Sequence, residues 1–119
     1  SPIQSVDTIR KAIAFMNQNF TEQITIKEVA DHIHMNPTYF SSIFKKATKK
    51  PFSQYLQQIR VEESKLLLTT TQQSILSVAI SCGFSSQSYF TKVFIKNTGI
   101  TPKEYRLQNA VIPIFQDNK

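Results

Sequence analysis

The sequence predicts an all-α fold of seven helices, and three features support this prediction. Glycine is scarce, with only Gly83 and Gly99 in 119 residues, so few positions interrupt a helix. The five prolines stand at apparent boundaries between segments. Apolar residues recur every three or four positions, which is the spacing of one face of a helix. With 40% hydrophobic residues the chain has enough apolar surface for a core, so wholesale disorder is not expected.

The first two helices are predicted in the N-terminal third of the chain. One runs from about Asp7 to Phe20, because apolar residues follow helical spacing there, at Ile9, Ile13 and Met16. The next lies within "TIKEVADHIHM", where Thr25 and Glu28 make a capping box. In that motif the Thr hydroxyl bonds a free amide one turn into the helix, and the Glu side chain reaches back. The apolar face of this helix contains Ile26, Val29, Ala30 and Ile33.

The third and fourth helices follow short turns. Asn36 is a good N-cap and Pro37 suits the first helical position, so the third helix starts there and runs to about Thr48. A longer helix is expected from about Phe52 to Thr69. Its inner side is formed by Phe52, Leu56, Ile59 and residues 66–68.

The short-helix pattern then returns. A fifth helix is expected in "SILSVAISCGF" with a turn at Gly83, and a sixth in "SQSYFTKVFIKN", which Gly99 closes. A last short helix starts near Pro102 in "TPKEYRLQ". The tail at 109–119 has no clear period. Its apolar part, from Ala110 to Phe115, either packs on the domain, contacts a further domain or is loose.

The chain contains an internal repeat. A shift of 49 residues aligns Ile26, Val29, Ala30 and Ile33 with Ile75, Val78, Ala79 and Cys82. After the turn the shift becomes 50, and it aligns Tyr39, Phe40, Phe44 and Lys46 with Tyr89, Phe90, Phe94 and Lys96. One extra residue in the second turn accounts for the change. Because most matched positions are apolar and helically spaced, the repeat predicts two copies of a helical hairpin core.

The outer faces of the third and sixth helices share an unusual composition. Helical spacing turns inward the residues Phe40, Ile43, Phe44 and Ala47 in the third helix, and Phe90, Val93 and Phe94 in the sixth. The opposite faces hold Thr38, Ser41, Ser42 and Lys45, and Gln87, Ser88, Thr91 and Lys92. Neither face has a carboxylate, so both can donate to phosphate oxygens and to base edges in a major groove. This pattern indicates two helix-turn-helix units, with the helices at about 37–48 and 86–97 entering adjacent grooves.

The charge distribution agrees with a polyanionic partner. The formal net charge is +6, which favours nucleic acid or an anionic membrane surface. Between Lys45 and Arg106 there are ten basic residues and three acidic ones. The linking helix, at about 17 residues, is roughly 26 Å long, and successive major grooves on one side of the duplex lie about 34 Å apart. With its flanking turns, such a spacer suits a chain that reads two grooves.

Other classes of protein find little support. The apolar stretches are too short for a membrane span or a signal peptide, and the single cysteine, Cys82, suits the cytoplasm. No Gly-rich phosphate loop, G-x-S-x-G elbow or recognisable carboxylate pair occurs, so the protein is not expected to be an enzyme, and no catalytic residue or cofactor is predicted.

Cys82 is interpreted as a core thiol. His32 and His34, two apart on a helix, point in different directions and disfavour a metal site. The alternative function is a helical interaction module whose basic side binds an acidic protein.

The segment "VAISCGFSSQSYFTKVFIKNTGITPKEYR" carries a family signature at Ala79, Gly83, Phe84, Ser88, Tyr89, Phe90, Phe94, Gly99, Thr101, Pro102, Tyr105 and Arg106. It resembles the AraC/XylS family of bacterial transcription regulators. The resemblance covers roughly Asp7 to Gln108 and implies a seven-helix DNA-binding domain with two helix-turn-helix subdomains joined by a long linking helix. It implies a first unit at 7–50, a linking helix at 51–70 and a second unit at 71–108, between a leader or linker at 1–6 and a C-terminal tail at 109–119.

By position, the family resemblance implies base contacts by Thr38, Ser41, Ser42, Gln87, Ser88, Thr91 and Lys92. Phosphate contacts are expected from Lys45, Lys46 and Lys96, and from Lys49 and Lys50 beside them. Arg60 matches a family position that either contacts DNA or braces the helices. The chain departs from the family pattern at Ile95, where a basic residue is common, and at Ser64, where a small apolar residue is usual.

The resemblance also implies partners. These are double-stranded DNA, RNA polymerase and an N-terminal sensor, dimerisation or receiver domain, in a regulator that either activates or represses transcription. Because the chain starts at Ser1 rather than Met, it is expected to be a fragment of a longer effector- or phosphorylation-controlled protein. The stretch "MNPTYFSSIFKK" is similar to members fused to a receiver, which implies a two-component response regulator.

Overall fold

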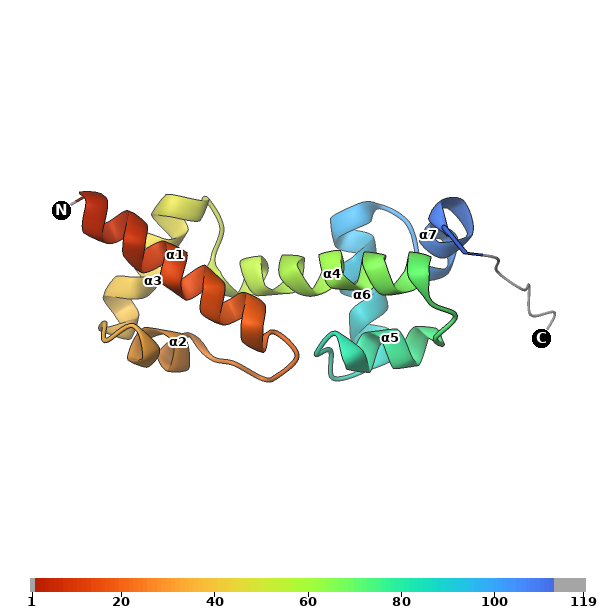
Figure 1. Cartoon of the computed structure of the whole chain (residues 1–119), viewed down its shortest axis with the longest axis horizontal. Coiled ribbons are helices and arrows are strands. Elements are labelled where there is room, and N and C mark those ends of the chain that lie inside the picture. Colours follow the sequence, from red (N-terminus) through yellow and green to blue (C-terminus); the bar gives the residue numbers. More distant parts are fainter. Residues whose placement is uncertain (1, 113–119) are drawn as a thin grey trace. The chain divides into compact units, whose positions relative to one another are not determined.

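The structure is a computed structural model that describes residues 2–112, with side chains described from residue 6. This part of the chain contains seven α-helices and no strand, which confirms the all-α prediction (Figure 1). The helices are α1 (Pro2–Asn19), α2 (Ile26–His32), α3 (Pro37–Thr48), α4 (Phe52–Thr70), α5 (Ile75–Ser81), α6 (Gln87–Thr98) and α7 (Pro102–Asn109).

The helices belong to two compact units, with the boundary between Ile59 and Arg60. The first unit contains α1, α2, α3 and the first part of α4, and the second contains the rest of α4 with α5, α6 and α7. Each unit has its own cluster of buried hydrophobic residues. The chain therefore builds two separate cores, as the internal repeat predicts.

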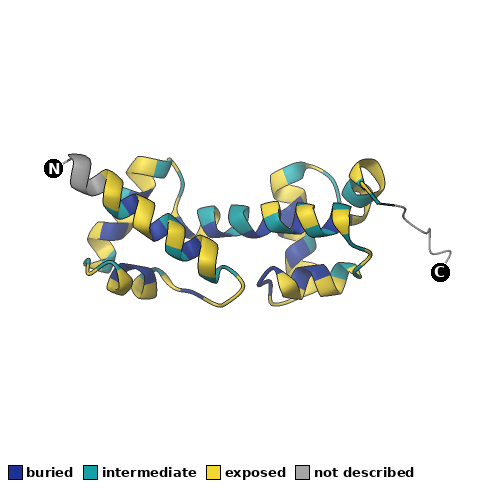
Figure 2. Cartoon of the chain, viewed as in Figure 1, coloured by how far each residue is buried: buried dark blue, intermediate teal, exposed yellow. Residues whose placement is uncertain are grey.

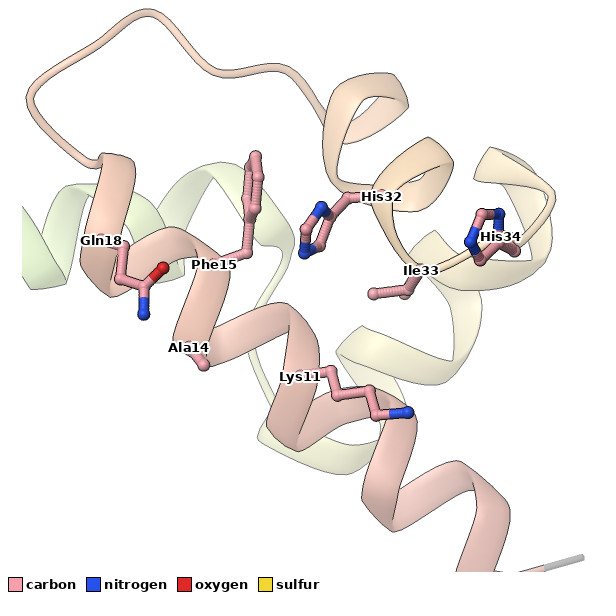
Figure 3. A pocket seen from close by; sticks show the side chains of 7 residues that line it. All are labelled: Lys11, Ala14, Phe15, Gln18, His32, Ile33 and His34. Carbon is pink, nitrogen blue, oxygen red and sulfur yellow. The ribbon is translucent and has the colours of Figure 1, made fainter.

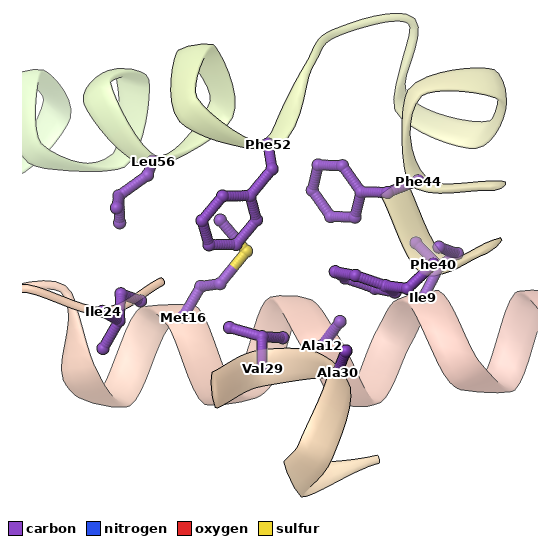
Figure 4. Packing of buried hydrophobic residues seen from close by; sticks show 10 residues of the cluster. All are labelled: Ile9, Ala12, Met16, Ile24, Val29, Ala30, Phe40, Phe44, Phe52 and Leu56. Carbon is purple, nitrogen blue, oxygen red and sulfur yellow. The ribbon is translucent and has the colours of Figure 1, made fainter. Parts of the chain in front are cut away.

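In the first unit, four helices and the loop before α2 supply the core. Figure 4 shows their side chains converging on one interior, with Met16 of α1 beside Phe52 of α4. Helix α1, the loop and α2 contribute the buried residues Ile9, Ala12, Met16, Ile24, Val29 and Ala30. Helices α3 and α4 contribute Phe40, Phe44, Phe52 and Leu56. Full burial of one such large side chain contributes about 1.5–3 kcal/mol, so this cluster is the main source of stability for the unit.

Helix α1 starts earlier than its apolar pattern indicates. It begins at Pro2, whereas the pattern predicts a start near Asp7. A proline is well tolerated at the first helical position, because its missing amide has no partner there and its fixed φ is already helical. From residue 6 onward, its buried residues Ile9, Ala12 and Met16 recur every three or four positions, as one face of an amphipathic helix requires (Figure 2).

The second unit repeats the design with different residues. Its buried cluster consists of Val61, Leu68, Val78, Ala79, Cys82, Phe84, Phe90, Val93 and Phe94. An aromatic pair shows how far the repeat extends. Phe44 packs edge-on against Tyr55 at 5.2 Å and 82°, and Phe94 packs against Tyr105 at 5.5 Å and 77°. The shift of 50 that relates α3 to α6 therefore also relates the start of α4 to α7.

The unusual residue Ser64 has a place in this second core. It is fully buried, and its Oγ donates to the Val61 carbonyl at 2.6 Å, so the hydroxyl is satisfied without a partner from outside α4. Its spacing to its buried neighbours on α4 equals that of Ala12 on α1, as the two triplets show: Ile9, Ala12, Met16 and Val61, Ser64, Leu68. Ser64 thus occupies the small-residue position that the family pattern assigns to it.

Candidate nucleic-acid interface

Two tight turns position α3 and α6. Helix α2 ends at His32, and His34 in the turn adopts a left-handed φ of 57°. The next amide, that of Met35, donates to the Ala30 carbonyl at 2.8 Å. The second turn places Gly83 at φ 92° in the same way, and the Phe84 amide donates to the Ala79 carbonyl at 3.0 Å. The sequence interpretation placed His34 on a helix, which is wrong, because its backbone conformation ends the helix before it.

Helices α3 and α6 begin with matching caps. Asn36 Oδ1 accepts from the Tyr39 amide, and Ser86 Oγ accepts from the Tyr89 amide, both at 3.1 Å. Because Phe84 matches Met35 and Ser86 matches Asn36, the extra residue of the second turn is Ser85. One inserted residue is thus absorbed between the turn and the cap, and the start of the helix is preserved.

Their C-terminal ends match as well. The hydroxyl of Thr48 donates to the Phe44 carbonyl at 2.8 Å, and that of Thr98 donates to the Phe94 carbonyl at the same distance. The following residue is left-handed in both units, with φ 65° at Lys49 and φ 85° at Gly99. Each 12-residue helix is therefore fixed at both ends by local hydrogen bonds.

The predicted base-facing residues lie on the surface. Exposed side chains on α3 are Thr38, Ser41 and Ser42, and on α6 they are Gln87, Ser88 and Lys92, while Thr91 is half-buried. Within residues 2–112 none of these side chains hydrogen-bonds another residue, so the polar groups of the exposed ones are open to solvent. Neither helix contains an Asp or Glu. Each face thus offers polar groups to an outside partner without a competing negative charge.

The predicted phosphate-facing lysines divide into two groups. Lys45, Lys46, Lys49 and Lys96 are exposed. Lys50 is half-buried, and its amine donates to Gln58 Oε1 on α4, a contact that the sequence interpretation did not foresee because the partner is eight residues away. Both units carry seven Lys or Arg and four Asp or Glu, so each has a net charge of +3. The positive charge is therefore shared between the two units.

The aromatic and aliphatic residues beside these faces differ in exposure. Phe40, Phe44, Phe90 and Phe94 have no exposed surface, as expected for core residues, and Ile43 is half-buried. Ala47 was expected to face inward, which is wrong, because it lies in the last turn of α3 and is exposed. The side chain of Tyr39 is 57% exposed and that of Tyr89 is 41% exposed, with the Tyr89 ring 6.0 Å from that of Phe84.

Sequence reasoning assigned the outer face of α6 to polar residues and named Ile95 only as a departure from the family pattern. This residue is 40% exposed. Its position three residues after Lys92 and seven after Ser88 places it on the same face. That spacing is the sequence signal that identifies it as part of the candidate interface.

Arg60 is buried within the second unit. Only 7% of it is exposed, so the structure favours the bracing role over contact with DNA. Burial lowers the pKa of its guanidinium, an effect that nearby Tyr89 and Cys82 partly oppose. Cys82 itself is fully buried, and burial raises the pKa of its thiol to about 12, with a further contribution from Glu63. A neutral, buried thiol is a poor nucleophile, which agrees with its interpretation as a core residue.

A pocket lies in the first unit, between α1 and the end of α2. Its volume is about 440 Å³, and it is lined by Lys11, Ala14, Phe15, Gln18, His32, Ile33 and His34 (Figure 3). The His32 ring lies 4.4 Å from that of Phe15, and the His34 ring is set apart from it. Among residues 2–112, no three His, Cys, Asp or Glu side chains gather where they could hold a metal ion. No helix of this part of the chain is long and apolar enough to span a membrane.

Comparisons with known proteins give consistent matches. A family profile described as a helix-turn-helix domain matches residues 29–108. The melibiose operon regulatory protein of Escherichia coli K12 is 33% identical over 98 residues, which cover 82% of this chain and 32% of that protein. The C-terminal domain of AraT, a response regulator from Geobacillus stearothermophilus, is similar in structure with a TM-score of 0.84 and 28% identity, covering 94% of this chain and 93% of that one.

A further solved structure was determined with nucleic acid. It is the DNA-binding domain of AdpA, a global transcriptional factor, in complex with a target DNA. Its TM-score to this chain is 0.79 at 27% identity, with 84% of this chain and 90% of that chain covered. The present chain spans about a third of the length of several curated relatives that it matches.

Proposed function

The chain belongs to the AraC/XylS family of DNA-binding transcription regulator domains, and on that premise we propose that α3 and α6 bind one duplex in a sequence-specific manner, each in a major groove. One observation carries this proposal. The two helices present outward faces without a carboxylate, and each helix is held by an equivalent turn, N-cap and C-cap. Two equivalent helix faces match two equivalent binding sites. Successive major grooves of B-DNA provide such a pair of sites.

The roles of the side chains follow from their chemistry. Gln87 can bond both the N6 and N7 edge atoms of adenine, and Lys92 can reach the acceptor edge of guanine, whereas the α3 hydroxyls are short. We therefore assign more base discrimination to α6. Base contacts are assigned to Thr38, Ser41, Ser42, Gln87, Ser88, Thr91 and Lys92. Phosphate contacts are assigned to Lys45, Lys46, Lys49 and Lys96, with a weaker one for Lys50, because its amine already has a partner in Gln58.

Helix α4 has a length that suits this proposal. At 19 residues, α4 is roughly 28 Å long at a rise of about 1.5 Å per residue. The distance between the centres of successive major grooves is about 34 Å. We propose that α4, with the turns that flank it, is the spacer that lets one chain address two grooves.

We further propose that the domain acts within a longer bacterial regulator. The similarity to the C-terminal domain of a response regulator supports an N-terminal receiver, and effector-binding or dimerisation domains are the other candidates for that place. The difference in length from the curated relatives supports the same proposal. Transcription activation through RNA polymerase, in the cytoplasm where the chromosome lies, is the activity assigned to the whole regulator.

The experiment is a titration of the chain against a selected duplex over a salt series, with an unrelated duplex as competitor. Each neutralised phosphate contributes a slope of about 0.9 in log affinity against log salt. Lys46→Ala should lower that slope by about one contact. Lys11→Ala removes the same charge from an exposed site on α1 and should leave it unchanged.

Specificity is tested on the same duplex. Gln87→Ala should relax the preference at one base pair, at a cost of about 1–3 kcal/mol for the preferred base. Weak binding that ignores both salt and sequence would instead support the helical module for an acidic protein partner. Unchanged base preference at every position in Gln87→Ala would remove the role assigned to that residue.

A further inference from the structure

The outer face of α6 contains an aliphatic residue, Ile95, in its C-terminal half. The inward side of the helix is defined by its three buried residues, Phe90, Val93 and Phe94. At 100° per residue, Ser88, Lys92 and Ile95 fall together on the side opposite these three. The exposed fraction of Ile95 is 40%, so its side chain is not covered by the rest of the unit.

The internal repeat supplies a direct comparison. The shift of 50 residues that matches the caps of α3 and α6 places Ile95 on Lys45. Both are exposed, so the same surface position carries a cation on α3 and a branched aliphatic chain on α6. A single exposed aliphatic residue needs no explanation by itself. Here it replaces a charge on a face whose other members carry hydroxyl, amide and amine groups.

The chemistry of the major groove narrows what Ile95 can recognise. Its side chain has no donor or acceptor, so it gains nothing from phosphate oxygens or from the hydrogen-bonding edges of bases. The one apolar group that bases present in this groove is the C5-methyl of thymine. We propose that Ile95 contacts a thymine methyl and makes α6 selective for thymine at one position of the bound site, an inference that rests on the proposed function of α6.

The position of Ile95 on the helix predicts which base pair it contacts. The backbone advances roughly 10 Å from Ser88 to Ile95. Stacked base pairs are about 3.4 Å apart, so this advance spans about three steps. Residues of one helical face that are spaced by about one turn read successive bases in other major-groove helices. The selected thymine therefore lies about three base pairs from the base that Ser88 contacts, with the base read by Lys92 between them.

The test replaces each thymine of the selected duplex, one at a time, by uracil. This change removes the C5-methyl and leaves every hydrogen-bonding group in place. Loss of one buried methyl predicts that uracil at a single position weakens binding of the unmodified chain about fourfold. Ile95→Ala should bind the thymine and uracil duplexes at that position equally well. Ile95→Val keeps a branched aliphatic side chain and should retain part of the preference.

Two further measurements separate the possible outcomes. The salt slope of Ile95→Ala should equal that of the unmodified chain, because no phosphate contact is removed, whereas Ile95→Lys should raise the slope by about one contact and lose the thymine preference. Specific binding with the same response to uracil in the unmodified chain and in Ile95→Ala would overturn the inference and leave the proposed function standing. No preference for any duplex would overturn the proposed function itself.

Discussion

At the scale of single residues, Lys49 and Gly99 meet the same backbone requirement at different cost. Both are left-handed at the end of a 12-residue helix, with φ 65° and 85°. In this region a side chain places its Cβ close to the following carbonyl, which costs about 1–2 kcal/mol, while glycine avoids that clash. A Cβ built on Gly99 has nothing within 4 Å, so the cost of a side chain at Gly99 comes from the backbone alone and not from a neighbour.

We therefore predict that Lys49→Gly stabilises the first unit by about 0.5–1 kcal/mol, after the added entropy of glycine in the unfolded chain is subtracted. Hydrogen exchange of the buried amides of α2 and α3 measures this change. Lys49→Ala is the matched control, because it removes the same charge but keeps the strained φ. If Lys49→Ala gains as much stability as Lys49→Gly, the strain account is wrong. The Lys49→Gly domain should still bind duplex DNA, with one phosphate contact fewer.

The buried thiol of Cys82 links the stability of the second unit to alkaline pH. The pKa of a cysteine rises from its ordinary 9.0 to about 12 in the fold, so the folded state favours the neutral thiol. Stability from this preference is fully present below pH 9 and is lost as the pH rises toward 12. Urea unfolding of the unmodified chain and of Cys82→Ala, each with reductant at pH 8 and pH 11, measures the effect. The stability advantage of the unmodified chain over Cys82→Ala should shrink at pH 11, and an advantage of the same size at both pH values would contradict the account.

At the scale of helices, Arg106 ties α7 to the end of α4. Its Nε donates to the Leu68 carbonyl at 2.9 Å, across 38 residues of sequence. That carbonyl belongs to the last turn of α4, where it has no amide partner within the helix and where a cation is favourable. Burial lowers the pKa of Arg106, and its Nη2 is buried without a hydrogen-bond partner among residues 2–112. The Val111 amide also donates to the Thr69 carbonyl at 2.9 Å, so the start of the tail packs on the same helix end.

Loss of this tie should destabilise the second unit. Arg106→Ala is predicted to lower the free energy of unfolding by about 1.5–3 kcal/mol, the range for a hydrogen bond from a charged group. Equilibrium unfolding in urea, followed by helical circular dichroism, measures the loss. Lys103→Ala changes an exposed cation on the same helix and should stay within about 0.5 kcal/mol of the unmodified chain. Equal losses in the two variants would mean that α7 is not held by this contact.

The helices differ in how far the sequence alone predicts them. Helices α3 and α6 were placed within a residue at their starts, because Asn36 with Pro37 and the serines before Gln87 are strong local signals. The short turn before Asn36 was predicted, but the left-handed backbone of His34 within it was not, since no glycine marks that position. The capping box predicted before α2 formed only in part: Thr25 Oγ1 accepts from the Glu28 amide and donates to the Glu28 carboxylate, both at 3.2 Å.

A complete capping box lies at α7 instead. Thr101 Oγ1 accepts from the Glu104 amide at 3.1 Å, and the Glu104 carboxylate accepts from the Thr101 amide at 3.2 Å. The two sequences have the same Thr-x-x-Glu spacing. The Glu28 carboxylate accepts from the Thr25 hydroxyl, whereas the Glu104 carboxylate accepts from the Thr101 amide. The spacing does not specify this side-chain geometry, so the motif predicts a helix start more reliably than it predicts a hydrogen bond.

At the scale of the whole chain, the repeat and the two cores followed from apolar spacing alone, because buried aromatic residues recur at a fixed shift. The candidate interface was predicted as the polar residues on the helix faces opposite the apolar residues that form the cores. That procedure located the exposed faces of α3 and α6 but did not assign the apolar, exposed Ile95 to a face, and it did not foresee the contact of Lys50 with Gln58. The DNA roles of the individual side chains stay predictions, because they depend on a partner.

The central claim is that one chain reads two sites on one duplex. Selection of bound sequences from a random duplex library tests it most directly, with the unmodified chain and with a Gln87→Ala, Lys92→Ala double variant selected in parallel. We expect two preferred sequence blocks whose centres lie about one helical turn, or 10–10.5 base pairs, apart, and the double variant should lose the preference in one block only. A single block for the unmodified chain, or the loss of both blocks in the double variant, would contradict the claim.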